Sequence, residues 1–115
     1  MKRKTADECL KQKIKEIVLQ EFKSKGLKLD KIVLFGSFAK GNQNRESDID
    51  LIIVSRDFRG KNIVEKVDMA SGLNWQLVHQ TKKPFDLLYC SDLEWKKASS
   101  LIISAAKKEG QVIYR

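Results

Sequence analysis

Residues 34–54 read LFGSFAKGNQNRESDIDLIIV, and the rest of the chain is organised around this segment. An apolar run at its beginning predicts a buried strand over residues 31–35. This strand stops at Gly36–Ser37, a dipeptide typical of turns. A polar loop follows, and a second apolar strand is predicted over residues 48–55.

Two acids open the second strand and indicate a cation site. Because side chains alternate between the faces of a strand, Asp48 and Asp50 point the same way. Two such carboxylates repel each other unless a cation lies between them, and oxygen ligands suit magnesium. Ser37, directly after Gly36, offers a hydroxyl and backbone N–H groups to a phosphate. The pattern favours a magnesium–phosphate site, although either half alone is also common in ordinary turns and strand starts.

The two halves together carry a family resemblance. Gly36–Ser37, the ten residues 38–47 and then Asp48-Ile49-Asp50 resemble the signature of the polymerase-β-type nucleotidyltransferase superfamily. The short chain is similar to its minimal nucleotidyltransferase (MNT) branch, which contains little beyond the catalytic domain. The resemblance implies an α+β fold of the two-layer α/β type, with a mixed central β-sheet packed with helices. It implies one minimal nucleotidyltransferase domain over residues 1–115.

Length and composition agree with a single soluble domain. A chain of 115 residues with 42% hydrophobic and 33% charged residues can build one core without disulfides. Its apolar runs are far shorter than the roughly 20 residues of a membrane span, and no apolar signal core follows the basic first residues. A cytoplasmic location without membrane contact is expected. Cys9 and Cys90 are expected to be reduced, and a single histidine, His79, argues against zinc.

The charge balance is strongly basic. Lysine and arginine number 23 against 15 acids, for a net charge of +8. Such a balance favours polyanionic partners, which include nucleotides, nucleic acid or an acidic protein. Many of the lysines fall in helical stretches such as residues 11–15, where they can simply line a solvated face. A nucleic-acid partner is therefore allowed by the charge but not required by it.

Helical periodicity and capping patterns predict the remaining elements. Thr5 and Glu8 form a capping-box pattern before a helix that stops near Gly26. Asn62 with Glu65, and Ser91 with Glu94, repeat that pattern before two later helices, and Gly72 is expected to weaken or break the first of them near its middle. Strands are predicted at residues 85–90 and 111–114, which completes an α/β order of elements. The apolar stripes expected to follow helical spacing are Leu10, Ile14, Ile17, Val18 and Phe22; Ile63, Val67, Ala70, Leu77 and Val78; and, pointing inward, Leu93, Ala98, Leu101, Ile102 and Ala105.

Asp86 lies near the start of the predicted strand 85–90. In the superfamily a third carboxylate from a later strand completes the metal site, and the resemblance implies that Asp86 fills this role. A buried, unpaired aspartate in a strand also carries a free-energy cost of several kcal/mol, which itself argues for a role. The alternative is a strand-end acid that pairs with Lys83.

Four further residues have both a functional and an ordinary interpretation. Lys40 and Arg45 are either solvated loop charges or contacts to a triphosphate or acceptor. Trp75 is expected in the core rather than as a platform for base stacking. His79 is expected to be a surface or packing residue rather than a general base.

The resemblance also implies the chemistry. Asp48, Asp50 and Asp86 would hold two magnesium ions as cofactors of a reaction that uses ATP. Gly36 would let the backbone approach the triphosphate, and Ser37 would contact its β- and γ-phosphates. Asp86 could also accept the proton of the hydroxyl that attacks the α-phosphorus.

Minimal nucleotidyltransferases are commonly partnered with a small helical HEPN protein, often a ribonuclease toxin. The resemblance implies an antitoxin that transfers AMP from ATP onto a hydroxyl, typically of a tyrosine, of that toxin. Two alternatives stay open. The protein could neutralise its partner by binding alone, or it could transfer a nucleotide to a small molecule or an RNA end.

Overall fold

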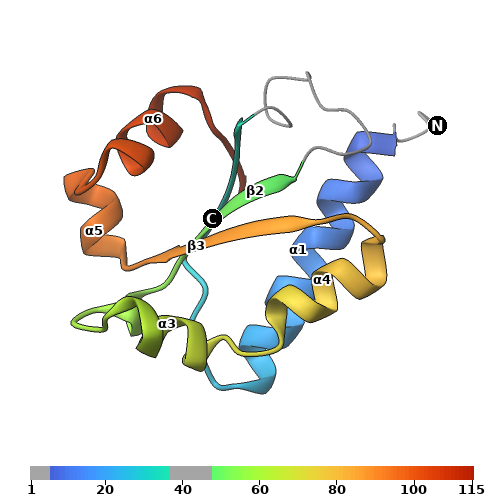
Figure 1. Ribbon diagram of the computed structural model, residues 1–115, viewed down its shortest axis with the longest axis horizontal. Helices are drawn as coiled ribbons and strands as arrows, with labels where there is room; N and C mark the ends of the chain where they lie inside the picture. The colour runs from blue at the N-terminus through green and yellow to red at the C-terminus, as the bar shows by residue number, and fades with distance from the viewer. Residues whose placement is uncertain (1–5, 37–47) are drawn as a thin grey trace.

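The computed structural model describes residues 6–36 and 48–115, which form a mixed sheet packed with helices, as predicted (Figure 1). The strand order is β3-β2-β1-β4. β2 and β3 run parallel, whereas β1 runs antiparallel to both of its neighbours. The elements in chain order are α1 (Ala6–Ser24), β1 (Lys31–Phe35), β2 (Ile49–Val54), the 3-10 helix η1 (Arg56–Phe58), α3 (Ile63–Met69), α4 (Leu73–Thr81), β3 (Phe85–Cys90), α5 (Asp92–Lys97), α6 (Leu101–Glu109) and β4 (Gln111–Tyr114).

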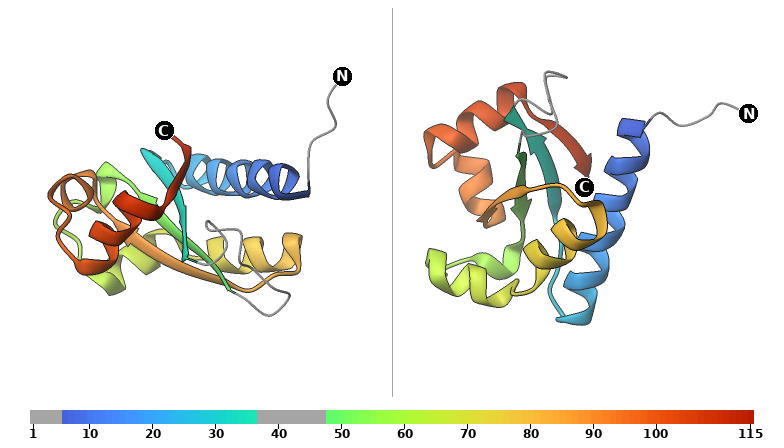
Figure 2. Two further views of the ribbon diagram at one scale, coloured as in Figure 1. Left: turned by 90° about the horizontal axis from the view of Figure 1, so that it is seen from above. Right: turned by 45° about the vertical axis from the view of Figure 1, so that its right-hand side comes forward.

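Helices cover both faces of the sheet. Because strand side chains alternate, Leu51 points into one core with α1 and α4, while its neighbour Ile52 points into a second core with α6. We call these sides the α1/α4 face and the α5/α6 face. Figure 1 shows α5 and α6 on one side of the strands and α1 and α4 on the other, and the right-hand view of Figure 2 keeps this separation.

The helix α1 confirms the first predicted stripe. Ile14, Val18 and Phe22 are fully buried against the sheet, and each such side chain contributes about 1.5–3 kcal/mol when it leaves water. The helix ends at Ser24, and Gly26 follows in the left-handed region with φ of 69°. At 19 residues α1 is the longest described helix, and no described helix is long and apolar enough to cross a membrane.

The predicted helix after Asn62 is divided in two. The capping box between Asn62 and Glu65 is present and opens α3. Gly72, with φ of 92°, then separates α3 from α4, because a left-handed residue cannot continue a helix. Ala70 and Leu77 are buried, whereas Ile63 and Val67 on the same predicted stripe are exposed at 76% and 49%.

The last predicted helix is also two helices, and of the five residues predicted to point inward only Ala98 packs against a core. Ser91 and Glu94 form the expected capping box, but Ala98 takes a left-handed φ of 49° and ends α5. Ser100 starts α6 anew, since its hydroxyl accepts a hydrogen bond from the Ile103 backbone. The new start turns the helix, so the buried side chains are Ile103 and Ala106, while those expected inside are exposed: Leu93, Leu101, Ile102 and Ala105.

Both cysteines are free, as predicted. Cys9 is exposed on α1, and Cys90 is buried at the end of β3. Burial raises the pKa of the Cys90 thiol to about 12. The thiol therefore stays protonated near neutral pH and behaves as a small apolar core group.

Candidate active site

The start of β2 and the start of β3 place two acids side by side. In the parallel register of these strands Asp50 pairs with Asp86, and on the other side of β2 Asp50 pairs with Phe35 at the end of β1. Adjacent strands lie about 4.8 Å apart, and paired residues face the same side of a sheet. Both acids lie on the α5/α6 face, because the next residues, Leu51 and Leu87, point into the opposite core.

Asp48 joins this pair from the residue before β2. The backbone N–H of Ile49 donates to the carbonyl of Pro84 at 2.9 Å, which ties the entry of β2 to the entry of β3. Ile49 itself is buried, whereas Asp48 on the preceding position is exposed. The spacing argument for Asp48 and Asp50 therefore holds in the fold, with a buried residue between two acids.

The three acids act on one another electrostatically. Burial raises the pKa of Asp50, and the nearby charges of Asp86 and Asp48 raise that pKa further. Within residues 6–36 and 48–115 no lysine or arginine forms an ion pair with any of them. The alternative partner of Asp86, Lys83, is one of those described residues and makes no such pair. Asp86 is exposed, so the expected cost of burying an unpaired aspartate does not arise, and that argument for its role was wrong.

Gly36 lies directly against this acidic group. Its φ of 76° is a left-handed conformation, and a Cβ atom built on it would collide with Oδ2 of Asp50. Glycine meets both demands at once, since it has no Cβ and no penalty at positive φ. The turn after β1 thus brings backbone against the Asp50 carboxylate. Ser37, Lys40 and Arg45 lie outside the described residues.

A comparison with known families identifies the chain. A family model described as "Nucleotidyltransferase domain" matches residues 11–113. The chain is a member of the nucleotidyltransferase family. This membership confirms the resemblance drawn from the segment between Gly36 and Asp50.

Solved structures with the same fold include known toxin–antitoxin components. A Sulfolobus solfataricus protein described as a "putative nucleotidyltransferase" aligns with 97% of this nucleotidyltransferase and 89% of its own chain, with a TM-score of 0.61 and 21% identity. A chain from the complex of tri-AMPylated Shewanella oneidensis HEPN toxin with MNT antitoxin aligns over 94% and 71%, with a TM-score of 0.60 and 17% identity. At such identities the likeness shows the fold.

One curated relative matches a short part of the sequence. It is a "putative protein adenylyltransferase" of Methanocaldococcus jannaschii, 47% identical over 30 residues. The match covers 26% of this nucleotidyltransferase and only 30% of the relative's length.

The acidic group has the donor chemistry for magnesium. The charges of Asp86 and Asp48 raise the pKa of Asp50, a repulsion that a divalent cation would relieve, and magnesium takes oxygen ligands. Within the described part of the chain no three acidic, histidine or cysteine side chains converge into a ready-made metal cage. Asp48, Asp50 and Asp86 are all among these residues, so their carboxylates do not converge into such a cage by themselves. Magnesium is usually held by one or two carboxylates, and substrate phosphates and water supply its other ligands.

Trp75 corrects a prediction. It was expected in the core, but it is 62% exposed and stacks on His79, with ring centroids 4.6 Å apart and planes 8° apart. The four-residue spacing on α4 makes this contact possible. His79 is on the surface, as predicted.

Proposed function

We propose that this nucleotidyltransferase transfers AMP from ATP to a hydroxyl, typically of a tyrosine, on a HEPN-type toxin and thereby acts as its antitoxin. The observation that carries the proposal is the register pairing of Asp50 with Asp86 beside Asp48, with no cation from the described residues to neutralise them. Folding alone gains nothing from three carboxylates that repel one another, so their presence favours catalysis over a site that has lost its chemistry.

Magnesium would be held by Asp48, Asp50 and Asp86. When bound there, it supplies positive charge against the triphosphate and lowers the pKa of the acceptor hydroxyl. The acids at the two strand starts thus determine where the nucleotide and the acceptor meet. The larger part of the protein's contribution is to hold these groups in position.

The remaining roles fall to residues around the acids. Asp86 accepts the proton of the acceptor hydroxyl as its oxygen forms a bond to the α-phosphorus. The bond between that phosphorus and the oxygen bridging to the β-phosphorus breaks, and pyrophosphate leaves. Gly36 leaves room for the backbone to approach the triphosphate, and Ser37 contacts the β- and γ-phosphates.

The choice of acceptor is supported by the relatives. The Shewanella oneidensis structure is a complex of a tri-AMPylated HEPN toxin with an MNT antitoxin, and another fold relative is a toxin–antitoxin complex with AMP-PNP. The latter aligns with 86% of this chain and 71% of its own, with a TM-score of 0.59 and 21% identity. We infer the same kind of partner and nucleotide here.

The test is to incubate the protein with labelled ATP, magnesium and the helical protein encoded next to it. The neighbour should become labelled with AMP, and Asp48→Asn plus Asp50→Asn should abolish both the labelling and the relief of toxicity. Asp68→Asn is the matched control, because Asp68 is an exposed acid on α3 away from the site.

The outcomes separate the three candidate functions. If the double variant still labels its partner, the assignment of Asp48 and Asp50 to the active site is wrong. Neutralisation that survives in the double variant, with no labelling by wild type, would identify an antitoxin that works by binding alone. Labelling of an RNA end or a small molecule, with none of the protein neighbour, would replace the acceptor and keep the transferase.

A further inference from the structure

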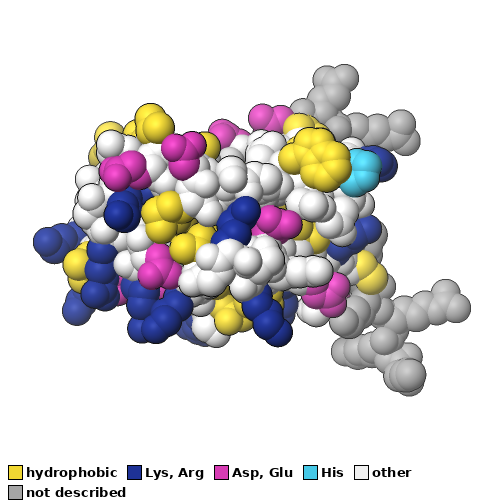
Figure 3. Space-filling view, turned by 90° about the horizontal axis from the view of Figure 1, so that it is seen from below, with side chains coloured by type: hydrophobic (Ala, Val, Ile, Leu, Met, Phe, Trp, Pro, Cys, Tyr) yellow, Lys and Arg dark blue, Asp and Glu magenta, His cyan; other side chains and the backbone are white. Residues whose placement is uncertain are grey.

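A hollow on the outer side of α4 combines an aromatic platform with two lysines. Its volume is about 560 Å³, within the range of small-molecule sites, and its lining includes Trp75, His79, Lys82 and Lys83. His79 covers one face of the indole in a parallel stack, while most of the Trp75 surface remains open. Figure 3 shows the cyan histidine at the surface beside a broad hydrophobic side chain and a basic one.

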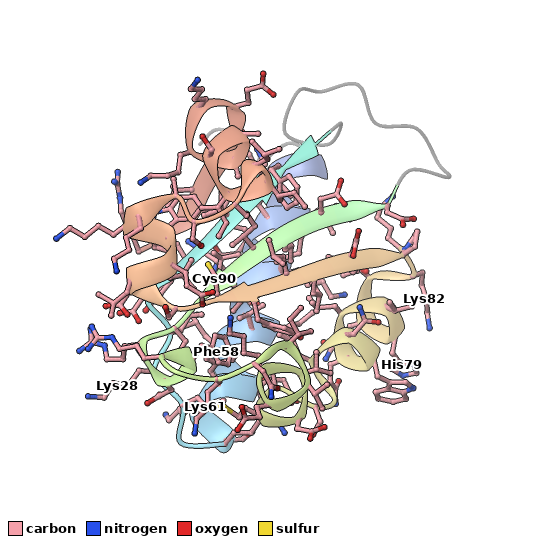
Figure 4. The ribbon with its side chains drawn as sticks, turned by 60° about the vertical axis from the view of Figure 1, so that its left-hand side comes forward. Lys28, Phe58, Lys61, His79, Lys82 and Cys90 are labelled. Atoms are coloured by element: carbon pink, nitrogen blue, oxygen red, sulfur yellow. The ribbon has the colours of Figure 1, made fainter. Side chains whose placement is uncertain are left out.

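The two lysines are free to meet an anion. Among the residues that the structure describes, neither Lys82 nor Lys83 forms an ion pair with an acid. Lys82 takes a left-handed φ of 60°, where glycine would be easier, and its N–H donates to the Val78 carbonyl at 2.8 Å. Figure 4 shows the side chains of Lys82 and His79 projecting from the same end of α4, far from Cys90.

The hollow lies at the same end of the sheet as the acids. Pro84, which also lines it, accepts the hydrogen bond from Ile49, and Asn74 donates to the Phe85 carbonyl at 3.3 Å. The hollow belongs to the α1/α4 face, whereas Asp86 faces the other side. β3, which carries Asp86, is the edge strand of the sheet.

We propose that this hollow binds a nucleobase and its phosphate from a single-stranded oligonucleotide. The base stacks on Trp75, a mode that tolerates any base, and Lys82 and Lys83 contact the phosphate. The net charge of +8 favours such a polyanion. A second hollow, about 280 Å³ between α1 and β4, has no aromatic side chain in its lining, which mixes Lys11 and Lys15 with Glu8.

The test uses tryptophan fluorescence in the full chain, without ATP. Trp95→Phe leaves Trp75 as the only tryptophan, and a short oligoadenylate should quench its emission. Trp75→Ala should weaken oligonucleotide binding, measured by anisotropy of a labelled strand, by roughly 5- to 150-fold. Trp75→Phe should recover part of the affinity, since a phenyl ring still stacks. The exposure of Trp75 makes a loss of folding unexpected, and circular dichroism verifies this.

The lysines are tested by a matched pair of double variants. Lys82→Gln with Lys83→Gln should weaken binding and reduce the slope of log affinity against log salt by roughly 1.4. Lys96→Gln with Lys97→Gln removes the same charge from α5 and should change the slope much less. Equal effects of the two pairs would mean that only the net charge attracts the strand, which would overturn the proposal.

Free AMP and an acidic peptide complete the experiment. Binding of AMP as tightly as the oligonucleotide, with the same loss in Trp75→Ala, supports the site and assigns it to mononucleotides. Trp75-dependent binding of the peptide, without binding of the oligonucleotide, would overturn the proposal in favour of a protein-docking surface. Oligonucleotide binding that is unchanged in Trp75→Ala would also overturn it. Asp50→Asn should retain the binding, so that failure of AMP transfer and failure of this site are distinguishable.

Discussion

At the start of β2 and β3, the acids Asp48, Asp50 and Asp86 meet no cation from the described residues, whereas the acids at the other end of these strands are paired. Arg56 donates to Asp30 at 2.9 Å, and Arg59 holds Asp92 through two hydrogen bonds and lowers the pKa of that carboxyl. The carboxylates are thus unpaired at one end of β2 and β3 and paired with arginine at the other end.

The clearest paired case is Glu94, which accepts hydrogen bonds from the Lys66 ammonium at 2.7 Å and from the Ser91 backbone at 2.9 Å. Partial burial opposes ionisation of Glu94, but these donors outweigh it and hold the pKa below its usual range. At Asp50 burial and neighbouring acids act together and raise the pKa. The paired acids stabilise the fold, whereas the unpaired acids at the starts of β2 and β3 are the candidates for binding a ligand.

The largest expected effect comes from replacing Asp86, at the start of β3, with asparagine, compared with the same replacement of Asp92 beyond its end. Asp86→Asn should lower the rate of AMP transfer by about 100- to 10,000-fold, because the proton acceptor is lost, with little change in ATP affinity. Asp92→Asn, just after the other end of β3, should leave the rate unchanged. Single-turnover transfer and ATP titration measure the two quantities. A wild-type rate in Asp86→Asn would remove this residue from the site.

At the paired end, Lys66→Met should destabilise the protein. Lys66 is only 5% exposed, so methionine keeps the buried apolar part of the side chain but removes the ammonium group that pairs with Glu94. Because the Glu94 side chain is 40% exposed and can be hydrated, we expect a loss of about 1–2 kcal/mol, less than for a fully buried pair.

Urea unfolding measures this loss, and a double-mutant cycle with Glu94→Gln isolates the coupling between the two side chains. A coupling energy near zero would show that the ion pair is without effect on stability, and the contrast between the two ends would fail.

Magnesium should stabilise the folded protein through the unpaired acids at the starts of β2 and β3. At ten times its dissociation constant, magnesium should raise the free energy of unfolding of the wild type by about 1.4 kcal/mol. Asp50→Asn should lose this response, and without metal it should be at least as stable as the wild type, since repulsion with Asp86 is relieved. Thermal melts with and without magnesium measure both. An equal response in the two proteins would place the ion elsewhere.

The smallest effect is a pH dependence at the paired end. The folded-state pKa of Glu94 lies below its ordinary value, so its ionised form stabilises the fold above the unfolded pKa of about 4.3. This contribution is lost as the pH falls through the folded pKa. Glu94→Gln should therefore be less stable than the wild type near neutral pH, and the difference should vanish in acid.

Glu65→Gln is the control for this comparison. Glu65 occupies the same capping position on α3 but has no lysine partner among the residues described. Its stability difference from the wild type should be smaller at neutral pH. If the two variants behave alike in urea titrations across this pH range, the lysine pair adds nothing beyond the cap.

Sequence patterns predicted the elements that depend on near neighbours. The strand before Gly36, the strand after Asp48 and both described capping boxes were found because each signal lies within a few residues. The stripe of Leu101 and Ile102 was misassigned, because the left-handed Ala98 breaks the helical period. The local signal for the break was Ser100, a preferred N-cap residue that starts α6.

The sequence by itself determined the family and the turn at Gly36, and it predicted Asp48 and Asp50 as site residues. Only the tertiary structure decided that Asp86 lies in register with Asp50, since parallel pairing across α3 and α4 depends on long-range packing. Packing likewise left Trp75 at the surface, because Leu73 and Leu77 already fill the side of α4 that meets the core. Local sequence patterns encode the helical and strand periods and the helix caps. Which distant residues lie close together, and which side chains stay exposed, depends on how whole helices and strands pack on the two faces of the sheet.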